Sequence, residues 1–160
     1  MSFTLPVGNF QSSALANALV RPSGVVDTVG TGTITNSNLA FDTSKTTYGL
    51  WTAIVPENTY SIFVFSASGT TLNKSVYILW SSDLFYPNWY GGMSMSIDNG
   101  VTYPYGVSVH FTSNSPVISS IIIPDGTAYS NIKLNVGPQH TAHAGLGSQI
   151  DTRVYDIYIQ

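Results

Sequence analysis

The chain has 160 residues, of which 43% are hydrophobic and only 8% are charged, and it contains no cysteine. Soluble domains average about 25% charged residues, so this chain must draw its polar surface from uncharged side chains such as its 21 Ser and 17 Thr. Five Lys and Arg against eight Asp and Glu cannot neutralise a phosphate backbone, which excludes nucleic acid as a partner, and the lack of cysteine excludes disulfides and thiolate metal sites.

The N-terminal residues carry no recognisable export signal. Met1–Pro6 shows no basic region followed by an apolar one, as a secretory signal would. No apolar run approaches the roughly 20 residues that a membrane helix needs, so we expect no membrane partner. An uncharged, Tyr-rich surface without export information is typical of phage structural proteins, which leave the cell by lysis. We therefore expect a protein made in the host cytoplasm and located in a virion.

Residues 1–24 differ from the rest and are predicted to form an N-terminal arm or docking segment. Apolar residues at helical spacing, Leu15 and Leu19 among them, predict a short helix over Gln11–Val20. It ends before Pro22 because the residue that precedes a proline avoids the helical conformation. We expect this arm to contact other virion proteins.

Residues 25–160 are predicted to form one domain of short strands divided by turns. Apolar and polar residues alternate in several segments, which indicates strands with one buried face, and Asp98-Asn99-Gly100 is a strong hairpin signal. The nine predicted strands are Val25–Ile34, Tyr60–Ser66, Val76–Trp80, Met93–Ile97, Val101–Tyr103, Val107–Phe111, Val117–Ile123, Ile132–Val136 and Val154–Ile159. Nine strands without a long helix predict an all-β fold, a single antiparallel β-sandwich or jelly roll.

Three segments resemble the discoidin-like, galactose-binding-like jelly rolls. Leu39–Trp51 is similar to their "A-F-D-G-n-x-x-T-x-W" segment, although Thr43 stands where the family has Gly after Asp. Ser94–Tyr103 resembles their "i-s-v-s-x-d-G-x-t-y" hairpin, and Arg153–Ile159 their final "r-i-x-e-i-x-i" strand. The likeness covers roughly residues 35–160. It implies a binding or scaffolding role, as in carbohydrate-binding modules and in phage tail fibre, baseplate or capsid accessory proteins.

The residue types that carry catalysis have local explanations in this sequence. Four acids stand beside turn-forming Ser, Thr, Asn or Gly residues: Asp42, Asp83, Asp98 and Asp125. Asp side chains satisfy the backbone of turns, so a pair of carboxylates for glycan hydrolysis is not indicated. The resemblance leaves open an oxygen-lined Ca²⁺ site around Asp42 or Asp98, but no spacing singles one out. We predict no enzymatic activity, no cofactor and no metal, with a glycan depolymerase on the same fold as an alternative.

His140 and His143 lie two residues apart in a Gly-rich stretch. Two histidines at this spacing can ligate a metal, but no third ligand is near in sequence and no helix aligns them. The segment is interpreted as a polar loop.

An aromatic segment, Phe85–Gly92, is the most distinctive part of the chain. Four aromatic residues lie within six positions, between two predicted strands, and loops on rigid sheets commonly carry function. The predicted carbohydrate-binding residues are Phe85, Tyr86, Asn88, Trp89, Tyr90, Tyr103 and Tyr105. In this hypothesis Trp89 and Tyr90 stack on sugar rings while Asn88 binds hydroxyl groups. Alternatively, the same rings cap the sandwich or pack against a neighbouring subunit.

These observations together predict a virion surface protein of a tail fibre or baseplate that attaches to host-surface polysaccharide. Because virion components assemble symmetrically and a sheet edge or an arm offers a pairing surface, we expect a homo-oligomer. The alternative is a capsid decoration or cement protein that binds no sugar.

Overall fold

The computed structural model describes residues 19–30, 32–54, 59–70, 74–82, 89–126, 128–140 and 149–160, with the backbone alone for 67–70, 89–90 and 139–140. The predicted helix over Gln11–Val20 lies outside these residues except for its last two. There Val20 forms a β-bridge with Ile159, so the segment is not helical where it meets the domain.

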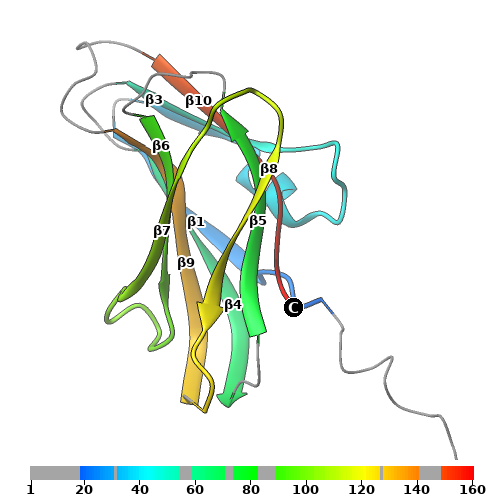
Figure 1. Ribbon diagram of the computed structural model, residues 1–160, viewed down its shortest axis with the longest axis vertical. Helices are drawn as coiled ribbons and strands as arrows, with labels where there is room; N and C mark the ends of the chain where they lie inside the picture. The colour runs from blue at the N-terminus through cyan, green and yellow to red at the C-terminus, as the bar shows by residue number, and fades with distance from the viewer. Residues whose placement is uncertain are drawn as a thin grey trace, which may run out of the picture.

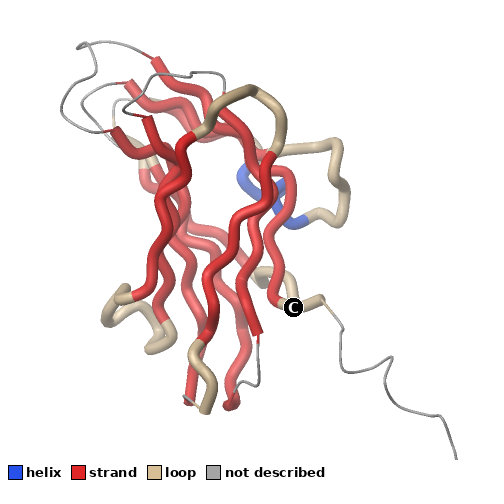
Figure 2. The backbone as a smooth tube through the Cα atoms, in the orientation of Figure 1, coloured by secondary structure: helices blue, strands red, loops and turns tan. Residues whose placement is uncertain are grey.

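The described residues form two antiparallel sheets of five strands that pack face to face (Figures 1 and 2). One sheet has the order β1-β4-β9-β6-β7 and the other β2-β3-β10-β5-β8. The strands are β1 (Gly24–Thr28), β2 (Thr33–Thr35), β3 (Gly49–Ile54), β4 (Tyr60–Thr70), β5 (Lys74–Ser82), β6 (Trp89–Ser96), β7 (Tyr105–His110), β8 (Val117–Ile123), β9 (Ala128–His140) and β10 (Gln149–Ile159), with a short 3-10 helix, η1 (Ser37–Phe41), before β3. This confirms the predicted antiparallel β-sandwich.

Two of the predicted strands differ from the observed ones, and one observed strand was not predicted. The segment Val25–Ile34 divides into β1 and β2, which lie in opposite sheets, and β3 was not predicted as a strand. Val101–Tyr103, predicted to be a strand, lies in the connection before β7. The Asp98 carboxylate accepts hydrogen bonds from the backbone of residues 101 and 102, which takes these donors out of a strand ladder.

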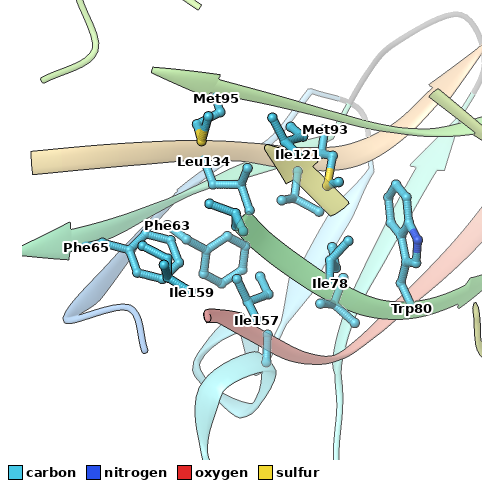
Figure 3. Close-up of a cluster of buried hydrophobic side chains, with 14 of the residues drawn as sticks. Phe63, Phe65, Ile78, Trp80, Met93, Met95, Ile121, Leu134, Ile157 and Ile159 are labelled. Atoms are coloured by element: carbon cyan, nitrogen blue, oxygen red, sulfur yellow. The ribbon is translucent and has the colours of Figure 1, made fainter. Parts of the chain in front are cut away.

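The core lies between the sheets and follows from the alternation of apolar residues (Figure 3). Phe63 and Phe65 of β4 face Ile157 and Ile159 of β10, and these side chains are almost completely buried. The other labelled members of the cluster are Ile78, Trp80, Met93, Met95, Ile121 and Leu134. Burying one such side chain stabilises a fold by roughly 1.5–3 kcal/mol, so the shared core fixes how the two sheets stack.

A chain of hydrogen-bonded polar groups also links the two sheets. The indole Nε1 of Trp51 on β3 donates to Ser61 Oγ on β4 at 2.8 Å. Ser61 Oγ in turn donates to Asp27 Oδ1 on β1 at 2.5 Å, and Ser37 Oγ of η1 donates to Asp27 Oδ2 at 2.9 Å. The Asp27 carboxylate therefore orients a serine that satisfies a fully buried tryptophan in the other sheet.

An ion pair fastens the beginning of the described chain to its last strand. The Arg21 guanidinium binds the Asp156 carboxylate of β10 through both carboxylate oxygens. The Asp156 side chain is 1% exposed and the Arg21 side chain 21%. Residues 20 and 21, at the end of the predicted arm, are thus part of the sandwich.

Candidate functional site

The predicted sugar-binding residues divide into two groups at opposite ends of one strand pair. Phe85, Tyr86 and Asn88 lie outside the described residues. Trp89 and Tyr90 begin β6, where Tyr90 pairs with His110 of β7. Tyr105 pairs with Met95 instead, five residues further along β6, which is about 17 Å at the rise of a strand.

This geometry separates residues that the sequence analysis assigned to one carbohydrate-binding site. Because β6 and β7 are antiparallel, the residues before β7 lie where β6 ends and not where it begins. Tyr103 and Tyr105 therefore do not share a site with Trp89 and Tyr90. A role in sugar binding for either group stays a prediction.

The tyrosines at the end of β6 are partly buried. Tyr105 packs against the core cluster. Tyr103 lies near Gly100 and Lys133, and its phenol is within reach of a side chain placed at position 100. Burial raises the pKa of the Tyr103 hydroxyl, with smaller contributions from the charges of Tyr60 and Asp98. Both rings are thus only partly accessible to a ligand.

Asp98 organises the turn that carries Tyr103. Its Oδ1 accepts from Ser96 Oγ at 2.6 Å and from the Thr102 amide at 3.0 Å. Its Oδ2 accepts from Thr102 Oγ1 at 2.7 Å. The next two residues, Asn99 and Gly100, have positive φ angles of 61° and 88°, as in a tight hairpin turn. Asp98 therefore has the structural role expected of a turn aspartate.

The hydrogen bonds to Asp98 make the turn sensitive to acid. The Ser96 hydroxyl and then the Thr102 amide and hydroxyl lower the pKa of the Asp98 carboxyl from 3.8 to about 2. A depressed folded-state pKa stabilises the fold above the unfolded pKa, and this stabilisation is lost as the pH falls through the folded pKa. We expect Asp98→Asn to be less stable than the parent at pH 6, with the difference shrinking between pH 4 and pH 2. Urea unfolding at several pH values measures it.

Thr102→Val removes the hydroxyl that donates to Asp98 Oδ2 and keeps the backbone amide that donates to Oδ1. It should therefore reduce the same pH dependence in part. Val101→Ala changes an exposed neighbour in the turn and serves as the control. An Asp98→Asn difference that stays constant from pH 6 to pH 2 would contradict this account of the turn.

A second acidic turn follows η1. Asp42 Oδ1 accepts from the Ser44 amide at 2.9 Å, and Oδ2 accepts from Thr47 Oγ1 at 2.7 Å. Thr43, where the resembled family has Gly, has a φ of 75°, a conformation that costs a β-branched residue energy. The turn keeps the backbone form that Gly would favour, and its carboxylate is used locally.

A cluster of four tyrosines covers the outer surface of the other sheet, the side that faces away from the core. We call it the tyrosine face; it comprises Tyr48, Tyr77, Tyr155 and Tyr158. Tyr77 of β5 and Tyr158 of β10 are register partners and their rings stack with centroids 5.3 Å apart and an interplanar angle of 19°. Tyr48 and Tyr155 meet edge to face with centroids 5.4 Å apart.

Polar side chains accompany these rings. The Arg153 guanidinium lies 5.4 Å from the centre of the Tyr48 ring, a cation–π geometry. Ser81 Oγ is 3.3 Å from the Tyr155 hydroxyl. Further along β10, Asp151 Oδ1 accepts from Thr52 Oγ1 at 2.8 Å and from Gln149 Nε2 at 3.0 Å. An aromatic ring beside a guanidinium group is suited to a ligand with both an apolar face and hydroxyls.

Sequence reasoning missed the tyrosine face although it predicted both of its long strands. Tyr77 alternates with the buried Val76 and Ile78, so its outward direction was readable. On β10 a register shift between Val154 and Asp156 interrupts the alternation. Tyr155 is the residue at this shift, and Tyr158 lies between the buried Ile157 and Ile159. Because a β-bulge inserts one residue into a strand, simple alternation of inward and outward residues does not predict this arrangement.

The described residues show neither a metal cluster nor a membrane-spanning helix. In the described part of the chain, no three His, Cys, Asp or Glu side chains gather in a way that could hold a metal ion. No helix among these residues is both long and apolar enough to cross a membrane. His140 is described by its backbone alone and His143 lies outside the described residues.

Comparisons with known proteins identify the fold. No protein-family model matches the sequence, and no curated protein matches it. The structure of TmCBM61 in complex with β-1,4-galactotriose superposes with a TM-score of 0.52 at 12% identity, over 86% of each chain. The enzymatically active domain of tailspike protein 4 from bacteriophage CBA120 superposes with a TM-score of 0.54 at 8% identity, over 85% of this chain but 19% of that one. The described residues thus share their β-sandwich fold with TmCBM61 and with this tailspike domain, which agrees with the resemblance to galactose-binding-like jelly rolls.

Proposed function

We propose that this chain is a non-catalytic carbohydrate-binding domain on the surface of a phage virion, in a tail fibre or baseplate, and that it attaches the particle to host-surface polysaccharide. The observation that carries the proposal is the tyrosine face. Tyr77 and Tyr158 stack in register on the outside of a rigid sheet, and aromatic faces of this kind bind the apolar faces of sugar rings. The Arg153 guanidinium lies over the neighbouring Tyr48 ring, where it could bind a hydroxyl group of the same sugar.

The fold supports the same reading. TmCBM61, which superposes over most of its length, was solved with a galactose trisaccharide, and the tailspike domain belongs to a phage. The low charge of this chain and its wealth of hydroxyl groups fit a surface that binds neutral glycan rather than charged ligands.

We propose that the chain is not catalytic because three of its aspartate carboxylates are engaged in structural contacts. Asp42 and Asp98 each accept hydrogen bonds from their own turns, and Asp156 is paired with Arg21. Hydrolysis of a glycoside requires two carboxyl groups roughly 5–10 Å apart across a cleft, with one of them raised in pKa. The pKa of the Asp98 carboxyl is lowered and not raised.

Sugar binding is tested first with β-1,4-galactotriose and then with a glycan array and with host polysaccharide. We expect the double variant Tyr77→Ala/Tyr158→Ala to lose at least tenfold in affinity, about 1.4 kcal/mol, by calorimetry or by retention on immobilised polysaccharide. Because neither ring lies in the core, the variant should keep the parent circular dichroism spectrum.

Two matched variants assign the surface. Trp89→Ala tests the β6 end and Tyr103→Ala tests the Asp98 turn. If either abolishes binding while the double tyrosine variant retains it, the site lies at that end of the sandwich and not on the tyrosine face. If the parent binds no glycan and the face is buried in the assembled particle, the protein is a capsid cement. Release of new reducing ends from polysaccharide would instead identify a depolymerase.

A further inference from the structure

Strand β8 (Val117–Ile123) is the outermost strand of its sheet and lacks the features that normally protect such an edge. Among the described residues, β5 is its single ladder partner. Natural edge strands carry Lys, Pro or a bulge that blocks further pairing. The sequence of β8, VISSIII, has no charged residue and no proline, and its ladder with β5 runs without a register shift. The strand is therefore competent to pair with another strand.

The exposed side chains of β8 are apolar. Ile118 is 65% exposed and Ile122 is 71% exposed, while Ile121 and Ile123 face the core. Ile118, Ser120 and Ile122 alternate with inward residues, so they lie on the outer side of the sheet, the side that carries the tyrosine face. Ile118 and Ile122 thus place two large, exposed aliphatic side chains on the outer edge of this sheet.

We propose that two copies of this chain pair antiparallel through β8, about a twofold axis at Ser120. In this register Ser120 lies opposite Ser120 of the second copy, and Ile118 of each copy lies opposite Ile122 of the other. Antiparallel neighbours of this kind have Cβ atoms about 5 Å apart. Both exposed isoleucines are then covered, by one another, in a single symmetric contact.

The symmetry of the pattern argues for a second copy over an unrelated partner. An isologous interface needs a surface that is complementary to itself, and the outward order Ile-Ser-Ile reads the same in both directions from Ser120. No charge on β8 opposes its own copy, whereas like charges directly opposite one another destabilise a strand pair. The two five-stranded sheets would join into one continuous sheet of ten strands.

This pairing also aligns the two tyrosine faces. Ser120 pairs with Tyr77 in the ladder between β8 and β5, and Tyr77 pairs with Tyr158. The two stacked pairs would therefore lie in one row across the joined sheet. Three strand spacings separate Tyr77 from its copy, which is about 14 Å. The value of this row for avidity rests on the proposed sugar binding; the pairing itself does not.

The register is tested by cross-linking through a single thiol, because the chain has no native cysteine. Ser120→Cys places two thiols at the axis, where the Cα separation of paired strands falls within the range that a disulfide requires. We expect mild oxidation to convert most of the protein to a covalent dimer at low micromolar concentration. Ser113→Cys, at an exposed position before β8, is the control and should cross-link far more slowly. Equal rates for the two variants would overturn the proposed register.

The interface is tested without sugar by analytical ultracentrifugation. The parent should sediment as a dimer, and Ile118→Lys should shift it to a monomer with an unchanged circular dichroism spectrum. Val26→Lys changes an exposed valine on β1, the edge of the other sheet, and should remain dimeric. A parent that stays monomeric at 100-fold higher protein concentration than the cross-linking assay, or a dimer that Val26→Lys dissociates and Ile118→Lys does not, overturns the proposal. Tyrosine variants that lose glycan binding but remain dimeric would agree with the proposed β8 pairing.

Discussion

Replacing Arg21 by Ala should destabilise the fold more than any other single change at the surface. The Asp156 carboxylate is buried on β10 and pairs with the Arg21 guanidinium. Removal of one partner leaves an uncompensated buried charge, which costs roughly 3–5 kcal/mol. A domain of this size unfolds with a free energy of about 5–15 kcal/mol, so a large share of its stability would be lost. Urea unfolding at pH 7 measures the change.

The matched control is Lys45→Ala, which removes one positive charge from an exposed loop residue and should change the unfolding free energy by less than about 0.5 kcal/mol. Adding Asp156→Asn to Arg21→Ala removes the orphaned charge and should recover part of the loss. If Arg21→Ala alone costs no more than Lys45→Ala, the pair does not secure the start of the chain to β10.

The fold was largely predictable because its signals are local. Alternation in Val107–Phe111 and Ile132–Val136 identified β7 and the centre of β9, and Val117–Ile123 matched β8 at both ends. These strands have one face on the core and the other outside it, so each residue's side follows from its position. The strand β3 was not predicted because its Gly49 and Trp51 were assigned to a family motif and not to a strand. Trp51 is buried with its indole against Gly49, where a Cβ would approach the ring to 2.7 Å.

The candidate site was less predictable because it depends on register. The sequence places Tyr103 and Tyr105 close to the aromatic segment, but the ladder between β6 and β7 carries them to the other end of the strand. The tyrosine face joins β5 to β10, residues about 80 positions apart in the chain, across a bulge that breaks the alternation. No local pattern reports which strands become neighbours, so only the assembled sheet brings Tyr77 and Tyr158 together.

Trp51 offers a test of whether packing or hydrogen bonding holds the two sheets in place. Its ring is fully buried and lies 6.0 Å from the ring of Phe63 in the opposite sheet. Its Nε1 donates to Ser61, which Asp27 orients. Trp51→Ala removes both contributions and should cost roughly 3–5 kcal/mol or more, because buried aromatic residues replaced by Ala lose this much from transfer and cavity terms.

Trp51→Phe separates the two contributions, since it keeps most of the apolar ring and removes the indole donor. Ser61 then still donates to Asp27 but loses its own donor, and the expected cost is about 1–3 kcal/mol. Ser61→Ala leaves the Trp51 Nε1 buried without its partner and should fall in the same range. Val101→Ala, at an exposed position, is the control for side-chain truncation. If Trp51→Phe costs as much as Trp51→Ala, the hydrogen-bonded chain from Trp51 to Asp27 dominates over packing. If Ser61→Ala is neutral, the polar link between the sheets contributes nothing and the core alone sets their stacking.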